Sequence, residues 1–131
     1  MIEYIARSTR NTKKYVVNTI GKEKLEHIYN LAEVYHSEPI EKVSLEIIDD
    51  CLINKGNYNR VYRVMPSFWD IGKVYQRLIV RISNDDRDYI LKLIEVFNSW
   101  IVSYIDNYDS SMYYENPEYI YECYKAGEIL S

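Results

Sequence analysis

The sequence predicts an all-α protein folded as a compact bundle of five to six helices. Apolar residues recur at spacings of three and four along most of the chain, as they do on one face of a helix. Glycine and proline account for only 7 of the 131 residues, which is well below the usual share of about 12% and disfavours a β-fold with many tight turns. No repeat or Gly/Pro-rich linker divides the chain. We therefore expect a single helical domain spanning residues 1–131.

The first two predicted helices meet at Gly21. A short helix around residues 12–20 ends there, because glycine readily leaves the helical conformation. A longer helix follows over residues 22–36 and carries one apolar stripe. The stripe consists of Leu25, Ile28, Tyr29, Ala32 and Tyr35.

The third predicted helix has a marked start and a marked end. Ser37 can cap its first turn and Pro39 suits that turn, while Lys55 and Gly56 provide a basic last turn and a stop. Its predicted buried stripe comprises Ile40, Val43, Ile47, Ile48, Cys51 and Leu52. Residues 57–65 that follow are compatible with a short strand, a loop or a helix ending before the proline at position 66.

The fourth predicted helix starts with a capping box made by Ser67 and Asp70. Its apolar positions continue to Ile82, and Gly72 within it suggests a close crossing of helices. The fifth predicted helix is the longest, because apolar spacing holds over residues 84–108 after a cap offered by Asn84, Asp85 and Asp86.

The last predicted helix is short. Asn116 and Pro117 start it and Gly127 stops it. Tyr119, Ile120, Cys123 and Tyr124 give it an apolar side.

The chain lacks the motifs of common catalytic and cofactor sites. It contains no Gly-rich phosphate loop, no C-x-x-C pair and no H-E-x-x-H pair. His27 and His36 are nine residues apart and do not share adjacent turns, so we expect no metal site. Cys51 and Cys123 are interpreted as two plain thiols in a reducing cytosol. We expect no catalytic activity, no cofactor and no small-molecule substrate.

Charge alternates along the chain in four blocks, although the net charge is only −4. Residues 1–24 and 55–82 are basic, whereas residues 25–54 and 83–131 are acidic. Within the second basic block, three cations at a spacing of four line one face of a helix, and two more precede them. These are Lys73, Arg77 and Arg81, with Arg60 and Arg63. They could contact nucleic-acid phosphates, or they could pair with the acidic segment that follows.

Tyrosine is the outlier of the composition, with 15 residues against two phenylalanines and two tryptophans. Seven of them fall in residues 104–131 among six acids and one lysine. Interfaces often use tyrosine, because the ring supplies contact area and the hydroxyl tolerates water. We therefore predict an acidic, tyrosine-rich face that binds a basic protein. Its predicted residues are Asp106, Tyr108, Asp109, Tyr113, Tyr114, Glu115, Glu118, Tyr121 and Glu122.

The segment SWIVSYIDNYDSSMYYENPEYIYECYKAGEIL, about a quarter of the chain, resembles in style the small acidic immunity proteins of bacterial toxin–immunity systems. The resemblance implies a cytoplasmic protein that binds a basic nuclease toxin tightly and occludes its active site or substrate groove. The alternative is a helical regulator associated with nucleic acid through the basic stripe of residues 60–81. No apolar run is long enough to span a membrane, and the first ten residues do not form a secretory signal.

Overall fold

Helices make up the regular structure in the described part of the chain. The computed structural model describes residues 1–32, 38–59 and 65–130, and within these ranges every regular element is helical. The chain divides into two compact units, Met1–Arg60 and Val61–Ser131. The all-α class is confirmed, and the prediction that residues 1–131 form one domain stays a prediction.

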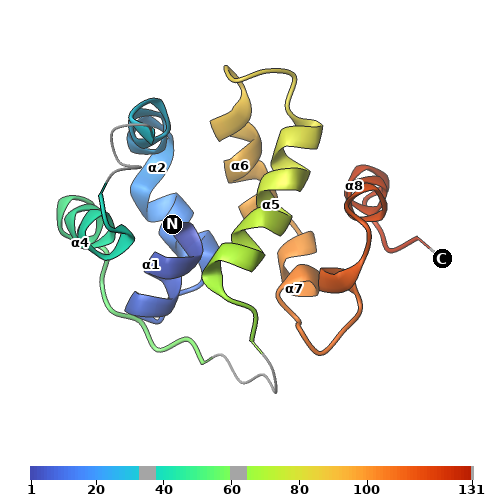
Figure 1. Cartoon of the computed structure of the whole chain (residues 1–131), viewed down its shortest axis with the longest axis horizontal. Coiled ribbons are helices and arrows are strands. Elements are labelled where there is room, and N and C mark those ends of the chain that lie inside the picture. Colours follow the sequence, from blue (N-terminus) through green and yellow to red (C-terminus); the bar gives the residue numbers. More distant parts are fainter. Residues whose placement is uncertain (33–37, 60–64, 131) are drawn as a thin grey trace. The chain divides into compact units, whose positions relative to one another are not determined.

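The first unit contains three described helices. They are α1 (Ile2–Thr9), α2 (Lys13–Asn30) and α4 (Ile40–Asp50), and α1 packs against both of the others (Figure 1). Gly21 interrupts α2 with a φ of 81° and a ψ of 163°, so the predicted boundary between two helical stretches is confirmed there. A helix over residues 2–9 was not predicted from the sequence. The core contains Ile5, Val16, Val17, Leu25, Val43 and Ile47.

The start and end of α4 differ from the prediction. Pro39 precedes the first helical residue as the N-cap instead of lying in the first turn, and the predicted cap Ser37 falls outside the described residues. The helix ends at Asp50, before the predicted stop at Lys55 and Gly56. Leu52 was predicted to be buried, but it adopts a φ of 54° and is 78% exposed. Because its backbone turns there, Ile53 takes the buried position instead.

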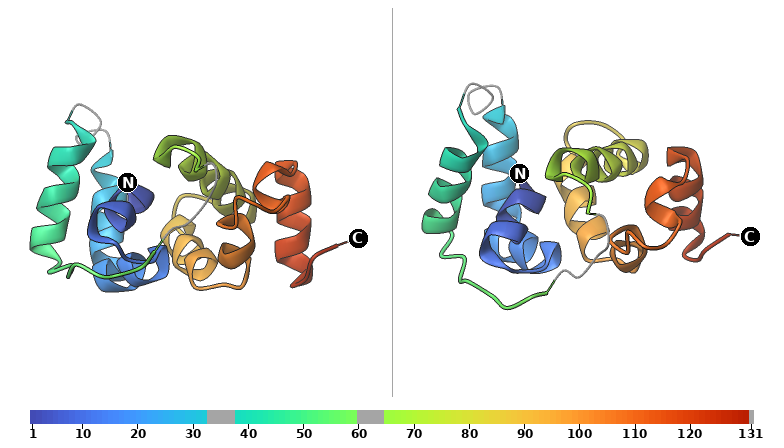
Figure 2. Two further views of the ribbon diagram at one scale, coloured as in Figure 1. Left: turned by 90° about the horizontal axis from the view of Figure 1, so that it is seen from below. Right: turned by 60° about the horizontal axis from the view of Figure 1, so that its bottom comes forward.

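The second unit places one long helix between two others. The elements are α5 (Phe68–Ile82), α6 (Tyr89–Phe97), α7 (Ile101–Ile105), the 3-10 helix η1 (Met112–Tyr114) and α8 (Pro117–Ala126). Helix α5 packs against α6 on one side and α8 on the other, as Figures 1 and 2 show. Its buried side chains include Ile71, Tyr75, Leu78 and Ile79.

Local capping residues explain the start of two helices. The hydroxyl oxygen of Ser67 accepts a hydrogen bond of 3.1 Å from the backbone N–H of Asp70, as the predicted capping box requires. Asn116 caps α8 by accepting from the N–H of Glu118 at 2.8 Å, and Pro117 occupies the first turn. Gly127 ends α8 with a φ of 79°. These three predictions are confirmed.

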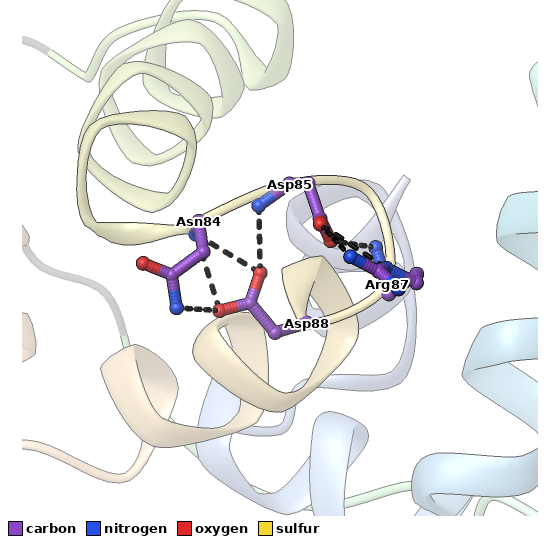
Figure 3. Close-up of polar contacts among 4 residues, drawn as sticks. All are labelled: Asn84, Asp85, Arg87 and Asp88. Carbon is purple, nitrogen blue, oxygen red and sulfur yellow. Dashed lines mark hydrogen bonds and ion pairs between the residues drawn. The ribbon is translucent and has the colours of Figure 1, made fainter.

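The predicted helix over residues 84–108 is wrong, because it divides into α6 and α7. Its first residues form a loop in which the carboxylate of Asp88 accepts hydrogen bonds from the N–H groups of Asn84 and Asp85 (Figure 3). Asp88 therefore precedes α6, in place of the predicted cap at residues 84–86. The other end of α6 is at Asn98 and Ser99, whose side chains donate to the carbonyl groups of Ile94 and Val96 beside backbone hydrogen bonds to the same carbonyl groups.

Two further expectations concern Gly72 and the ambiguous segment of residues 57–65. A Cβ atom added to Gly72 would meet nothing within 4 Å, so the predicted close crossing at this glycine is wrong. Residues 57–59 and 65–67 form no regular element, and residues 60–64 of the ambiguous segment lie outside the described residues.

Candidate functional site

The predicted site residues belong to one stretch of the second unit, which runs from the end of α7 through η1 into α8. Between α7 and η1 the chain makes a turn, in which the hydroxyl of Ser110 donates to the carbonyl of Asn107 at 2.8 Å. The N–H of Asp109 donates to the side-chain oxygen of Asn107 at 3.3 Å. These short-range hydrogen bonds stabilise the turn between α7 and η1.

Five of the nine predicted residues are exposed. They are Asp109, Tyr114, Glu115, Glu118 and Glu122. The prediction that some of the tyrosines of this segment lie at the surface is confirmed for Tyr114, which is 64% exposed.

Two of the predicted tyrosines point inward. Tyr108 is 5% exposed and Tyr121 is 9% exposed. The guanidinium carbon of Arg81 lies 4.0 Å from the centre of the Tyr121 ring, so this ring face is covered by the protein's own cation. Neither ring offers a free face to a partner, because packing inside the unit already uses both.

Two of the predicted carboxylates are engaged within the unit. Asp106, which is half-buried, accepts a 2.6 Å hydrogen bond from the hydroxyl of Tyr75. Glu118 lies 3.3 Å from a guanidinium nitrogen of Arg81. The hydrogen bonds to Glu118 raise the pKa of the Arg81 guanidinium. Asp109, Glu115 and Glu122 are exposed and their carboxylates form no ion pair or hydrogen bond within the described part of the chain.

A ladder of three rings supports the exposed tyrosine. The Tyr113 ring meets Tyr108 edge-on at a centroid distance of 5.5 Å and an angle of 79°. It meets Tyr114 on its other side at 4.9 Å and 87°. Edge-to-face pairs of this kind stabilise a defined ring orientation. The buried Tyr108 therefore anchors Tyr113, and Tyr113 fixes the position of the exposed Tyr114.

Beside this ladder, α5, η1 and α8 enclose a groove of about 350 Å³. Its lining is formed by Asp70, Lys73, Val74, Arg77, Leu78, Tyr113, Tyr114, Glu115, Pro117 and Ile120. Sequence reasoning missed this groove, because its walls lie far apart in the chain. The opposite charges of the blocks 55–82 and 83–131 were the one signal that the two segments lie close together.

The basic stripe on α5 divides into two parts. Lys73 and Arg77 are exposed and have no ion pair within the described part of the chain. Arg81 pairs with Glu118 of α8, so its partner lies in the last helix and not in the acidic helix that was expected to follow the stripe directly. Arg60 and Arg63 lie outside the described residues.

The residue types typical of metal and nucleophile sites were located in the described part of the chain. Among them, no group of three or more His, Cys, Asp and Glu side chains could hold a metal ion. Cys51 and Cys123 are free thiols, and Cys123 is fully buried. Burial raises the pKa of the Cys51 thiol, which disfavours the nucleophilic thiolate. His27 is exposed on α2, and His36 falls outside the described residues.

Comparison with known protein families, with curated proteins and with solved structures finds no match to this chain. Within the described residues, no helix combines the length and the apolar character needed to cross a membrane.

Proposed function

We propose that this protein is a non-catalytic inhibitor that binds a basic protein partner through the surface around Tyr114. The observation that carries the proposal is the ring ladder, which presents one exposed tyrosine in a fixed orientation next to Glu115. Binding energy at protein interfaces concentrates in a few such aromatic residues, and holding the ring in place beforehand reduces the entropy lost on binding.

The outward acids support a partner of opposite charge. Asp109, Glu115 and Glu122 are exposed, and the protein carries a net charge of −4. Carboxylates around an aromatic anchor accelerate the encounter with a basic surface and disfavour acidic partners. The contribution of Tyr108 and Tyr121 is structural in this proposal, because both rings are buried.

The partner proposed is a basic nuclease toxin in the bacterial cytoplasm, with the protein acting as its immunity protein. A bound acidic surface would occupy the groove that takes nucleic-acid phosphates and so exclude the substrate. The free thiols of Cys51 and Cys123 are compatible with a reducing compartment.

Co-expression with a panel of basic nuclease toxin domains tests the proposal. We expect the wild-type protein to restore growth against at least one domain and to form a stoichiometric complex with it in vitro. The double variant Tyr114→Ala/Glu115→Lys should weaken that complex at least about 30-fold, as loss of an interface anchor does. Tyr15→Ala/Glu23→Lys makes the same changes at exposed positions of the first unit and serves as the matched control. Absence of any rescue, or equal rescue by both double variants, would contradict the proposal.

A second candidate function is a nucleic-acid-associated regulator. What favours it is that Lys73 and Arg77 lie exposed on one face of α5, within reach of Tyr113 and Tyr114 across the groove. Binding to duplex DNA that falls steeply with salt, and that is lost in Lys73→Gln/Arg77→Gln, would support this candidate instead.

A further inference from the structure

Helix α4 of the first unit carries aliphatic side chains that its own unit does not cover. Leu45 and Leu52 are 63% and 78% exposed, and Ile48 between them is half-buried. The core is supplied by other positions of the same helix, Val43 and Ile47. Residues three and four apart lie on one side of a helix, so Leu45 and Ile48 share a face and Leu52 follows at its end. We call Leu45, Ile48 and Leu52 the α4 strip.

Leu52 stands at a position that leucine occupies only at a steric cost. The N–H of Leu52 donates to the carbonyl of Asp49 at 3.3 Å, and the N–H of Ile53 donates to the carbonyl of Ile48 at 3.0 Å. This is the Schellman pattern, whose left-handed residue is usually glycine, but here it is Leu52 with a φ of 54°. A glycine would satisfy the turn equally well, so the turn gives no reason for an exposed leucine side chain.

Carboxylates border the α4 strip. Glu41 and Asp49 each lie four residues from Leu45 and therefore on the same side of the helix. Both are exposed, and their carboxylates form no ion pair or hydrogen bond within the described residues. Lys42 of the same helix is already paired with Glu38 at 2.9 Å. The border of the strip is thus negatively charged.

An acidic border around aliphatic side chains selects between classes of occupant. Nucleic acids and anionic lipid surfaces carry the same sign of charge as the border and are repelled by it. A second copy of the chain that used this face would bring two acidic borders together, which is also unfavourable. A protein segment with an apolar side flanked by lysine or arginine matches both the aliphatic strip and its charge.

We infer that the α4 strip docks an amphipathic helix of a basic protein. The apolar side of that helix contacts the three strip residues, and its flanking lysines or arginines pair with Glu41 and Asp49. A helix fits because spacings of three and four, as in the strip, form the apolar seam between packed helices, and charges beside such a seam determine the partner. This surface belongs to the first unit, so the inference does not depend on the function proposed for the surface around Tyr114.

Two synthetic peptides test the inference on the full-length protein. Both are 18-residue amphipathic helices with leucine on one side, and the remaining positions are lysine in one peptide and glutamate in the other. We expect the Leu/Lys peptide to shift the NMR signals of Leu45, Ile48 and Leu52 until saturation, and the Leu/Glu peptide to leave them unchanged. Leu45→Ser/Leu52→Ser should weaken binding of the Leu/Lys peptide, followed at Ile48, at least about tenfold.

Two further variants separate loss of contact from loss of fold. Leu52→Gly removes the side chain but suits the positive φ, so binding should weaken while the Tm stays at or above that of the wild type. Val80→Ser/Leu91→Ser removes two aliphatic side chains of the second unit that are 56% and 48% exposed. This matched control should leave binding at Ile48 unchanged.

A second pair of variants tests the charge of the border. Glu41→Gln/Asp49→Asn should weaken binding of the Leu/Lys peptide at Ile48 at least about threefold. Asp109→Asn/Glu122→Gln removes two exposed acids of the second unit and should not change it.

Several results would overturn the inference. One is that the Leu/Lys peptide causes no shift at the α4 strip, and another is that the Leu/Glu peptide binds there equally well. Wild-type affinity in Leu45→Ser/Leu52→Ser or in Glu41→Gln/Asp49→Asn would have the same meaning. So would a wild-type dimer, measured by sedimentation, that Leu45→Ser/Leu52→Ser converts to a monomer, because the strip would then bind a second copy.

Discussion

The hydroxyl of Tyr75 in α5 donates a 2.6 Å hydrogen bond to the carboxylate of Asp106, the residue that follows α7. Tyr75 is almost completely buried, and its ring also packs against Phe97 of α6 at a centroid distance of 4.7 Å. One side chain therefore links α5 to both halves of the segment that the sequence predicted to be a single helix. Asp106 acts in this link as an acceptor inside the unit, which argues against its predicted role in binding a partner.

Tyr75→Phe tests this structural role. The variant keeps the ring and removes the hydroxyl, so we expect a loss of about 2 kcal/mol in the free energy of unfolding, typical of a hydrogen bond to a charged group. Urea unfolding followed by tryptophan fluorescence reports on this unit, because both tryptophans, Trp69 and Trp100, belong to it. Tyr114→Phe, whose ring is exposed, should change stability by less than about 0.5 kcal/mol. Similar losses in the two variants would contradict the assignment.

Two glycines should respond in opposite directions to the same substitution. Gly72→Ala places its new Cβ in open space on α5 and should stabilise the protein by roughly 1 kcal/mol, because alanine favours helix. Gly56→Ala places its Cβ 2.1 Å from the side-chain oxygen of Asn11 and 2.5 Å from the carbonyl oxygen of Arg10, so we expect a loss of about 2 kcal/mol. Urea unfolding followed by circular dichroism measures both changes. A neutral Gly56→Ala would mean that the contact with Asn11 relaxes readily.

Helix starts were predictable where the determining groups are local. In two helices, the capping residue and the first turn lie within four residues of one another. The capping residues are Ser67, followed by Asp70, and Asn116, followed by Pro117. The helix boundary at Gly21 was predictable for a similar reason, because glycine readily adopts the positive φ found there. Such features need no information about the rest of the fold.

The division of residues 84–108 could not be predicted from spacing alone. Phe97, Trp100, Ile101 and Ile105 continue the apolar periodicity across the break. The break falls at Asn98 and Ser99, whose side chains donate to backbone carbonyl groups, and residues of this kind also occur within intact helices. The burial of Tyr121 could not be predicted either, because the cation that covers its ring is Arg81 of a different helix.

The contact between Arg81 and Tyr121 should be less sensitive to salt than an ordinary surface ion pair. Arg81→Gln removes both a cation–ring contact and the ion pair with Glu118. Arg87→Gln removes only the exposed pair with Asp85. Because salt screens ion pairs at the surface, we expect the effect of Arg87→Gln on the Tm to disappear at 0.5 M NaCl, whereas Arg81→Gln still lowers the Tm through the lost ring contact. Equal Tm values at high salt would show that the ring contact contributes nothing.

Stability of the first unit should depend on pH through a buried ion pair. Glu3 and Lys13, which are 4% and 3% exposed, lie 2.5 Å apart, and Arg7 pairs with the other carboxylate oxygen at 2.7 Å. Burial alone would raise the pKa of Glu3, but Lys13 and Arg7 together lower it below its ordinary value of 4.5. Because the folded-state pKa is lowered, the stabilisation is complete above about pH 4.5 and is lost as the pH falls through the folded-state value.

Glu3→Gln measures this contribution. At pH 7 the variant removes the carboxylate charge that lies against the buried Lys13, so the unit should lose about 3 kcal/mol. As the pH falls below 4.5, Glu3 of the wild type becomes protonated, and the difference between the two proteins should shrink towards zero. Hydrogen exchange of the backbone amides of α1 and α2 measures this difference in the stability of the first unit. Glu46→Gln, at an exposed position of α4, should show no such pH dependence. A constant difference between wild type and Glu3→Gln from pH 7 to pH 3 would mean that the cost lies in packing and not in the charge of Glu3.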